Sequence, residues 1–200
     1  FTRYSKRIKG DAVEQLITPY GGEVVNLLVD STRVAELKRD AFNLPSLDFS
    51  WRQQCDLELL LNGGYTPLTG YLGQADYLSV LHSMRLADGR AWALPVVLQI
   101  HETLAHSLKP GERLALRDPE GFMLAVVTVN EIWTADIELE AEQLGCAIDA
   151  PGKWYVGGAV EGLSLPLRHD FLALRLGPAE LRAGFARLGW RSVIAYPART

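Results

Sequence analysis

A turn signal between two apolar runs, near the middle of the chain, constrains the fold more than any other feature. Asp118-Pro119-Glu120-Gly121 separates the run Glu112–Leu116 from the run Phe122–Val129. Apolar runs of this length, bounded by proline and glycine, predict two antiparallel strands joined as a hairpin. We therefore expect the middle of the chain to form a β-rich domain.

Further apolar runs on both sides of the hairpin extend this β pattern. Trp92–Ile100 and Lys153–Val160 each read as a strand, and so does Glu23–Val29. Gly157 and Gly158 stand inside the second of these runs. Paired glycines in a strand indicate a bulge or the close approach of another backbone.

Four helices are expected within the β-rich part: Ser31–Ala41, Trp51–Leu61, Asp76–Met84 and Ile137–Leu144. The second has the clearest boundaries. Ser50 is an expected N-cap, and Gln53 stands three residues later, as a capping box requires. Asn62-Gly63-Gly64 predicts its end, because Asn and Gly tolerate the left-handed cap conformation.

The C-terminal part of the sequence follows a different pattern. Pro178 opens a predicted helix, and Leu181, Phe185 and Leu188 recur on one face of it. The apolar run Ser192–Tyr196 follows and reads as a buried strand. A helix that leads into such a strand predicts the start of an α/β domain after the β-rich one.

The composition is that of a globular protein and argues against two kinds of partner. The chain has 200 residues, of which 48% are hydrophobic, and a formal net charge of −4. A mildly acidic chain is a poor binder of nucleic acid, because phosphate neutralisation needs a clustered basic surface. No apolar run approaches the roughly 20 residues that span a bilayer. We expect a cytoplasmic protein without a nucleic-acid or membrane partner.

No metal site is expected in these residues. Cys55 and Cys146 lie far apart and neither belongs to a Cys-x-x-Cys pair. His101 and His106 lie in a predicted loop, and their spacing misses the i, i+4 pattern of helical zinc ligands by one residue. Cys55 is expected to be a small buried side chain of the helix that contains it.

Two further groups of residues admit both a functional and a structural interpretation. Asn62–Tyr71 is rich in turn formers and aromatic residues, which is typical of a ligand loop or of a packed loop with Tyr65 and Tyr71 buried. We favour the packed loop. His169-Asp170 follows Arg168 and could form a polar cluster at an interface, although a structural role is favoured.

Arg199 is the residue with the most specific position. It follows the predicted strand Ser192–Tyr196, at the place where open α/β sheets bind ligands. The planar fork of a guanidinium suits a tetrahedral oxyanion. The pattern alone leaves open whether Arg199 binds one.

Several long blocks, in order, resemble the ATP sulfurylase (sulfate adenylyltransferase) family. The likeness runs from about Leu16 to the end of the chain. The blocks that carry it are Leu16–Gly22, Val25–Val29, Cys55–Tyr71, Tyr155–Leu163 and Pro178–Arg182, with Phe185, Gly189-Trp190 and Val193 after them.

The resemblance implies an α+β fold with two parts. Residues 1–165 would form a β-rich, PUA-like pseudo-barrel domain. Residues 166–200 would form a linker and the first helix and strand of a Rossmann-like nucleotidyltransferase domain. In this family sulfate attacks the α-phosphorus of ATP, with Mg²⁺, and gives adenylyl sulfate and pyrophosphate. Mg-ATP would bind in the remainder of the catalytic domain, and no cofactor is expected in these 200 residues.

The resemblance also implies a damaged catalytic motif. The family has Gln-x-Arg-Asn directly after the strand, so Arg199 falls on its arginine and Ala198 on its variable position. Pro197 replaces the glutamine and Thr200 replaces the asparagine. Arg199 is therefore the candidate catalytic residue, and Arg199 and Ala198 are the candidate substrate-binding residues. The family's His-x-x-His motif would lie after Thr200.

The first interpretation is that the chain is part of a sulfurylase homologue in sulfate assimilation or sulfur metabolism. The sulfurylase activity of that protein would be weak or absent. These 200 residues alone would not turn over substrate. Sulfate and ATP would be its substrates, and the protein would form a homo-oligomer. Two alternatives remain open: an active sulfurylase that uses other residues, and a non-catalytic assembly or regulatory domain attached to an adenylyl-sulfate kinase. RNA binding by analogy with other PUA-like folds is a weaker alternative, because fold analogy is a weak warrant and the net charge opposes it.

Overall fold

A six-stranded sheet organises the computed structural model, which describes residues 16–145, 153–190 and 192–196. The strands follow the order β1-β4-β5-β6-β2, and β3 also pairs with β6. β1 is parallel to β4, and the other pairs are antiparallel. The strands are β1 (Ser46–Asp48), β2 (Gly70–Tyr71), β3 (Leu98–Ile100), β4 (Arg113–Arg117), β5 (Met123–Thr134) and β6 (Trp154–Gly162).

The hairpin predicted at the centre of the sequence is confirmed as β4 and β5. Asp118 closes its turn with both backbone and side chain. The Phe122 amide donates to Asp118 Oδ1 at 2.7 Å, and the Asp118 amide donates to the Phe122 carbonyl at 2.9 Å. Gly121 has a φ of +88°, a value that glycine adopts at little cost. The turn therefore fixes the register in which the apolar residues of β4 and β5 pair.

The glycines predicted to mark a bulge or a close approach in β6 mark both. A Cβ at Gly157 would stand 2.5 Å from the Leu72 carbonyl oxygen, and one at Gly158 would clash with the Thr128 carbonyl oxygen. The pairing of β5 with β6 shifts register between Val129 and Glu131, opposite these two glycines. Glycine is required here because neighbouring backbone occupies the space of a side chain.

Helices surround the sheet at the predicted places: α1 (Ser31–Asp40), α2 (Trp51–Leu61), α3 (Gln74–Ser83) and α5 (Ile137–Leu144), with a 3₁₀ turn (Ala41–Asn43) after α1. The Ser50 capping box is confirmed, because the Gln53 amide donates to Ser50 Oγ at 3.4 Å and the Ser50 amide donates to Gln53 Oε1 at 3.0 Å. A further short helix, α4 (Glu102–Ser107), stands where a loop with His101 and His106 was expected.

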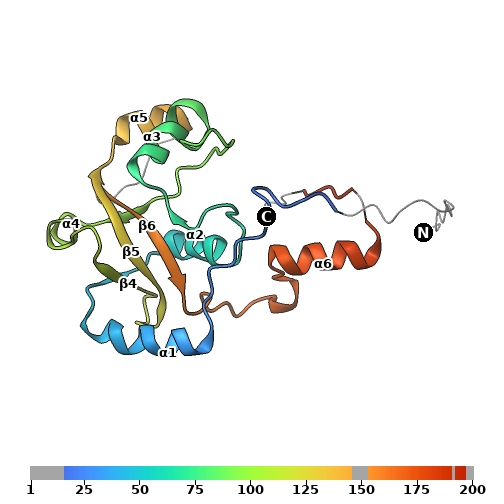
Figure 1. The fold of residues 1–200 in the computed structure, drawn as a ribbon, viewed down its shortest axis with the longest axis horizontal. Helices are drawn as coiled ribbons and strands as arrows, with labels where there is room; N and C mark the ends of the chain where they lie inside the picture. Colours follow the sequence, from blue (N-terminus) through green and yellow to red (C-terminus); the bar gives the residue numbers. More distant parts are fainter. Residues whose placement is uncertain (1–15, 146–152, 191, 197–200) are drawn as a thin grey trace.

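The main core lies between α2 and the sheet. Leu57, Leu60 and Leu61 of α2 are buried against apolar residues of the strands. A second cluster forms where α3 meets α5, around Tyr77, Trp133 and Tyr155. Figure 1 shows α3 and α5 together at one end of the sheet and α1 at the other.

Two strand predictions were too long. Of Glu23–Val29, only Leu28 pairs, as an isolated parallel bridge with Gly162, because the segment meets the sheet only at the last residue of β6. The Leu27 amide donates instead to the Leu61 carbonyl at the end of α2. Of Trp92–Ile100, only Leu98–Ile100 forms a strand. Pro95, within that run, has no amide hydrogen to donate to a neighbouring strand.

The C-terminal part stands away from the sheet, as Figure 1 shows. A linker with a 3₁₀ turn (Leu172–Leu174) leads to α6 (Pro178–Leu188), which ends at Gly189 as predicted. The strand predicted at Ser192–Tyr196 does not form. A strand requires a hydrogen-bonded neighbour, and residues 192–196 make no backbone hydrogen bond to another segment of the described chain. No helix in the described ranges is long and apolar enough to cross a membrane.

Candidate functional site

The site predicted at Pro197, Ala198, Arg199 and Thr200 lies outside the described residues. The structure therefore shows only the approach to it, through α6 and residues 192–196. Within the described part, a cavity lies elsewhere.

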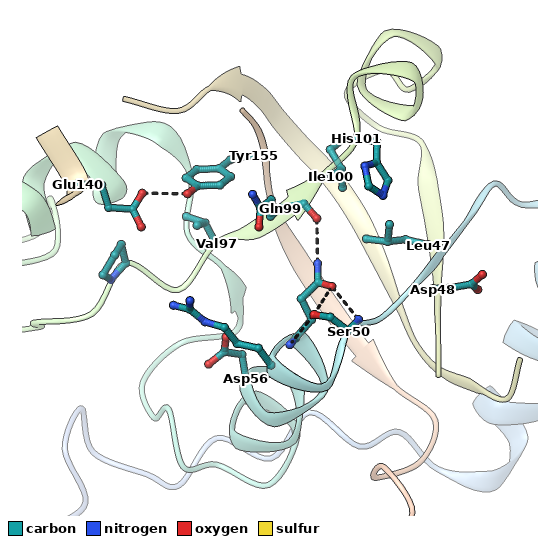
Figure 2. A pocket seen from close by; sticks show the side chains of 13 residues that line it. Leu47, Asp48, Ser50, Asp56, Val97, Gln99, Ile100, His101, Glu140 and Tyr155 are labelled. Carbon is teal, nitrogen blue, oxygen red and sulfur yellow. Dashed lines mark hydrogen bonds between the residues drawn. The ribbon is translucent and has the colours of Figure 1, made fainter. Parts of the chain in front are cut away.

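A cavity of about 390 Å³, lined by both polar and apolar side chains, lies where the start of α2, residues 95–101, α5 and β6 meet. Figure 2 shows Glu140 and Tyr155 on one side of it, His101 and Leu47 on the other, and Gln99 and Ser50 between them. Its volume is in the range of small-molecule sites.

The wall formed by α5 and β6 carries a buried carboxylate. Glu140 is 5% exposed, and its Oε2 accepts hydrogen bonds from the hydroxyl of Tyr155 at 2.9 Å and from that of Tyr77 at 3.0 Å. Burial and the nearby Glu140 charge raise the pKa of both tyrosines above the ordinary tyrosine value. Both hydroxyls therefore stay protonated at neutral pH and act as fixed donors, not as bases.

The opposite wall is held in place by the cap of α2. Besides closing the capping box, Gln53 donates through Nε2 to the Gln99 carbonyl at 3.0 Å, and so ties the start of α2 to β3. Asp56, one turn further along α2, accepts a hydrogen bond from the Tyr65 hydroxyl at 2.9 Å. The residues that shape the cavity are thus fixed by bonds between separate elements.

The charge of the lining determines which ligands the cavity suits. The lining includes three acidic residues, Asp48, Asp56 and Glu140, and one arginine, Arg52. Carboxylate oxygens accept hydrogen bonds and repel anions. The charge balance therefore disfavours a tetrahedral oxyanion in this cavity, so it does not replace the site expected around Arg199.

The structure supports the interpretation of Asn62–Tyr71 as a packed loop over its interpretation as a ligand loop. Tyr71 is buried, and Tyr65 is half-buried with its ring edge-on to Trp92, the two centroids 6.0 Å apart. Cys55 is a free thiol and only half-buried, contrary to the buried position expected for it. The histidines do not gather: the described residues contain no group of three or more His, Cys, Asp or Glu placed to hold a metal ion.

Sequence reasoning missed one charged cluster. Arg168 does not form a polar group with the exposed His169 and Asp170; its side chain turns onto α2 and pairs with Glu58, with Nη2 at 2.6 Å from Glu58 Oε2. The pair is separated by more than a hundred residues in sequence, so no local pattern could have predicted it.

The C-terminal part presents an apolar surface instead of a cavity with charged groups. Phe171, Leu174 and Ile194 are among its most exposed side chains, and Ile194 is 95% exposed. Leu181, Phe185 and Leu188, predicted to share one face of α6, line a shallow apolar groove together with Trp190. Large exposed apolar patches mark surfaces that contact other protein.

Comparison with known proteins gives consistent matches. Residues 17–165 match the family described as "PUA-like domain". The sulfate adenylyltransferase of Eremothecium gossypii is 37% identical over 195 residues, which are 92% of this chain and 39% of the relative. That of Mycosarcoma maydis is 39% identical over 196 residues, or 90% of this chain and 34% of the relative.

Solved structures are also similar to this chain. "Hexameric APS kinase from Thiobacillus denitrificans" is 44% identical, with a TM-score of 0.73, over 88% of this chain and 32% of that one. The chain therefore spans well under half the length of these relatives.

Proposed function

Because the chain belongs to the PUA-like domain family and its sequence matches the N-terminal domain of sulfate adenylyltransferases, we propose that it is the N-terminal part of a sulfate-activating protein. The parent protein would be a sulfurylase homologue whose own sulfurylase reaction is weak or absent. The motif at 197–200 is the observation that carries this proposal.

The proposed domain boundary follows from the contrast in burial along the chain. Residues 1–165 would form the PUA-like domain, and residues 166–200 the linker and the start of the catalytic unit. The family match ends at residue 165, and residues 169–176 are all exposed. The apolar face of α6 is then the surface against which the rest of the catalytic unit would pack.

The replaced residues bear directly on the chemistry. Pro197 has neither a side-chain amide nor a backbone donor, and Thr200 has one hydroxyl where an asparagine would have an amide. The loss of one preorganised donor costs about 3–4 kcal/mol, or roughly 10²–10³ in rate. With both donors lost, Arg199 alone would hold the transferring anion, and Ala198 would contribute only backbone.

Sulfate and Mg-ATP are assigned by resemblance to the catalytic unit beyond Thr200. The described residues carry no cluster of metal-binding side chains, and the cavity beside α2 has more acidic than basic residues in its lining, which disfavours either anion. When bound, Mg²⁺ would neutralise phosphate charge. The contribution of this chain would be to position the catalytic unit.

A link to adenylyl-sulfate kinase is part of the proposal. The APS kinase structure is 44% identical to this chain, whereas the two sulfate adenylyltransferases are 37% and 39% identical. A protein that kept a kinase and lost its sulfurylase would tolerate Pro197 and Thr200, because only the kinase would remain under selection. That relative is hexameric, which supports a homo-oligomer here as well.

The test uses the full-length protein and two reactions. We expect formation of ATP from adenylyl sulfate and pyrophosphate to stay below about 1 per second, the lower end of ordinary enzyme rates. Phosphorylation of adenylyl sulfate by ATP should proceed normally. The double variant Pro197→Gln, Thr200→Asn should gain sulfurylase activity, and adding Arg199→Ala should abolish that gain. Sulfurylase turnover at ordinary enzyme rates in the unaltered protein would show that other residues complete its site.

The second candidate function is a non-catalytic assembly domain. The exposed apolar surface of residues 166–196 favours it, as does the hexameric relative. Deletion of residues 1–200 should then dissociate the oligomer, which light scattering would detect, while the remaining kinase keeps its turnover. An unchanged oligomer would exclude this function.

A further inference from the structure

The linker leaves the PUA-like domain at one defined point. After β6, the amides of Leu163 and Ser164 both donate to the Leu124 carbonyl, and Pro166 is buried. Residues 169–176 are then exposed without interruption. Arg168 is thus the last residue to contact the domain before the chain leaves its surface, and Figure 1 shows α6 standing apart beyond this point.

Arg168 contacts three residues of α2. Its side chain is 7% exposed, and Nε and Nη2 donate to Glu58 Oε2 at 3.0 and 2.6 Å. Nη2 also donates to Cys55 Sγ at 3.6 Å. The guanidinium carbon lies 4.1 Å from the centroid of the Trp51 ring, as in a cation–π contact. One face of α2, over its first two turns, therefore receives the linker.

The chemistry of this cluster requires arginine. A guanidinium can donate from two nitrogens to a carboxylate and stack on an aromatic ring at the same time, whereas a lysine ammonium can do only part of this. Burial opposes the charge of Arg168, but the hydrogen bonds and charge of Glu58 outweigh it and raise the pKa above the ordinary arginine value. Nη1 is buried without a hydrogen-bond partner, so shape and the other contacts must hold the side chain in place.

We propose that Arg168 is a positioning residue that fastens the linker to α2 through Glu58 and Trp51, and so sets where α6 and the catalytic unit stand relative to the PUA-like domain. The inference rests on the proposed function for the identity of the unit that follows. A second, more exposed contact supports the same geometry: Arg182 of α6 donates to the Ile17 carbonyl. The Arg168 cluster is the stronger of the two because it is buried.

The rate at which a protease cleaves the linker measures how firmly Arg168 holds it to α2. Chymotrypsin cuts after large apolar residues, and Phe171 and Leu174 are exposed within the linker. In the full-length protein, Arg168→Gln should increase the cleavage rate there by about tenfold, because loss of hydrogen bonds to a charged group shifts a local opening equilibrium by this much. Arg168→Lys should recover only a minor part of the protection, since it loses the fork and the stack.

A matched control separates this effect from general destabilisation. Arg113 also forms an ion pair, with Asp40 at 2.9 Å, but this pair lies within the PUA-like domain and away from the linker. Arg113→Gln should leave linker cleavage unchanged. Cys55 supplies an independent readout: in a background whose other cysteines, Cys146 among them, are replaced by Ala, Arg168→Gln should accelerate its reaction with a thiol reagent, and Arg113→Gln should not.

A double-mutant cycle completes the test. Glu58→Gln should increase cleavage as Arg168→Gln does, and the double variant should add little to either, because both remove the same pair. Additive effects, or equal cleavage in Arg168→Gln and Arg113→Gln, would overturn the proposal. None of these measurements needs enzymatic turnover, so failure here is distinguishable from failure of the proposed function.

Discussion

The PUA-like domain buries its apolar side chains, whereas the C-terminal residues 166–196 leave many of theirs exposed. In the domain, residues such as Leu57 and Leu98 are fully buried. In the C-terminal part, Leu188 of α6 is 56% exposed and Ile194 is 95% exposed. Both regions show the amphipathic patterns of folded protein. The difference shows that an apolar face predicts burial only where its neighbours are present.

The strongest test of this difference is to replace a glycine by alanine in both regions. Gly158→Ala places a methyl group against the Thr128 carbonyl in the middle of the sheet, whereas a methyl group added at Gly184 of α6 would meet no atom within 4 Å. Gly158→Ala should cost at least about 3 kcal/mol of unfolding free energy, measured by urea unfolding. Gly184→Ala should stabilise α6 by up to about 1 kcal/mol, measured by amide hydrogen exchange. Equal effects would mean that β6 can move away from β5.

A matched pair of leucines gives the next largest difference. Leu57 is fully buried in α2, and Leu188 lies exposed on α6. In the 200-residue chain, Leu57→Ala should reduce the unfolding free energy by about 2–5 kcal/mol, and Leu188→Ala should change it by less than about 0.5 kcal/mol. In the full-length protein Leu188→Ala should cost more, because the proposed catalytic unit would cover this face. If its cost is the same in both, α6 does not pack against that unit.

The elements that could be predicted were those determined by local signals. The hairpin at Asp118 and the capping box at Ser50 both follow from interactions within a few residues. Ser192–Tyr196 has equally clear apolar character, but a strand needs a partner strand, and the sequence of the strand does not supply it. Local pattern is sufficient for turns and caps and insufficient for pairing.

The candidate site shows the same limit. The cavity joins Ser50, Gln99 and Glu140, which lie on separate elements, and no spacing in the sequence relates them. The contact of Arg168 with Glu58 is equally non-local. Arg199 could be singled out only because it follows a predicted strand and falls on a family motif. It lies outside the described residues, so its role remains a prediction.

Alkaline pH should destabilise the domain through the tyrosines of its second cluster. Burial and the charge of Glu140 raise the pKa of Tyr155 in the folded state. The pKa of a tyrosine in the unfolded chain is near 10. The stabilisation that Tyr155 provides is therefore complete below pH 10, and it is lost as the pH rises from there through the pKa of Tyr155 in the folded state. Between pH 10 and 11 each such tyrosine should reduce the unfolding free energy by up to about 1.4 kcal/mol.

Urea unfolding at a series of pH values checks this expectation against Tyr155→Phe. The variant loses the hydrogen bond to Glu140, so it should be less stable at pH 7. Its deficit should shrink by about 1 kcal/mol as the pH rises to 11, because it has no hydroxyl to titrate. A deficit that stays constant over this range would show that Tyr155 ionises as readily in the folded protein as in the unfolded one.

The helix caps give the smallest contrast between the two regions. Ser50 caps α2 with its side chain, whereas Gly177, at the same position of α6, has none to offer. Ser50→Ala should cost about 1 kcal/mol, and Gly177→Ser should stabilise α6 by a few tenths of a kcal/mol, because its backbone already has the extended conformation of a cap. Urea unfolding and hydrogen exchange in α6 measure the two changes. A loss of more than about 2 kcal/mol in Ser50→Ala would exceed any cap alone, and would mean that Gln53 also releases the Gln99 carbonyl, so that the cap and the cavity wall form one unit.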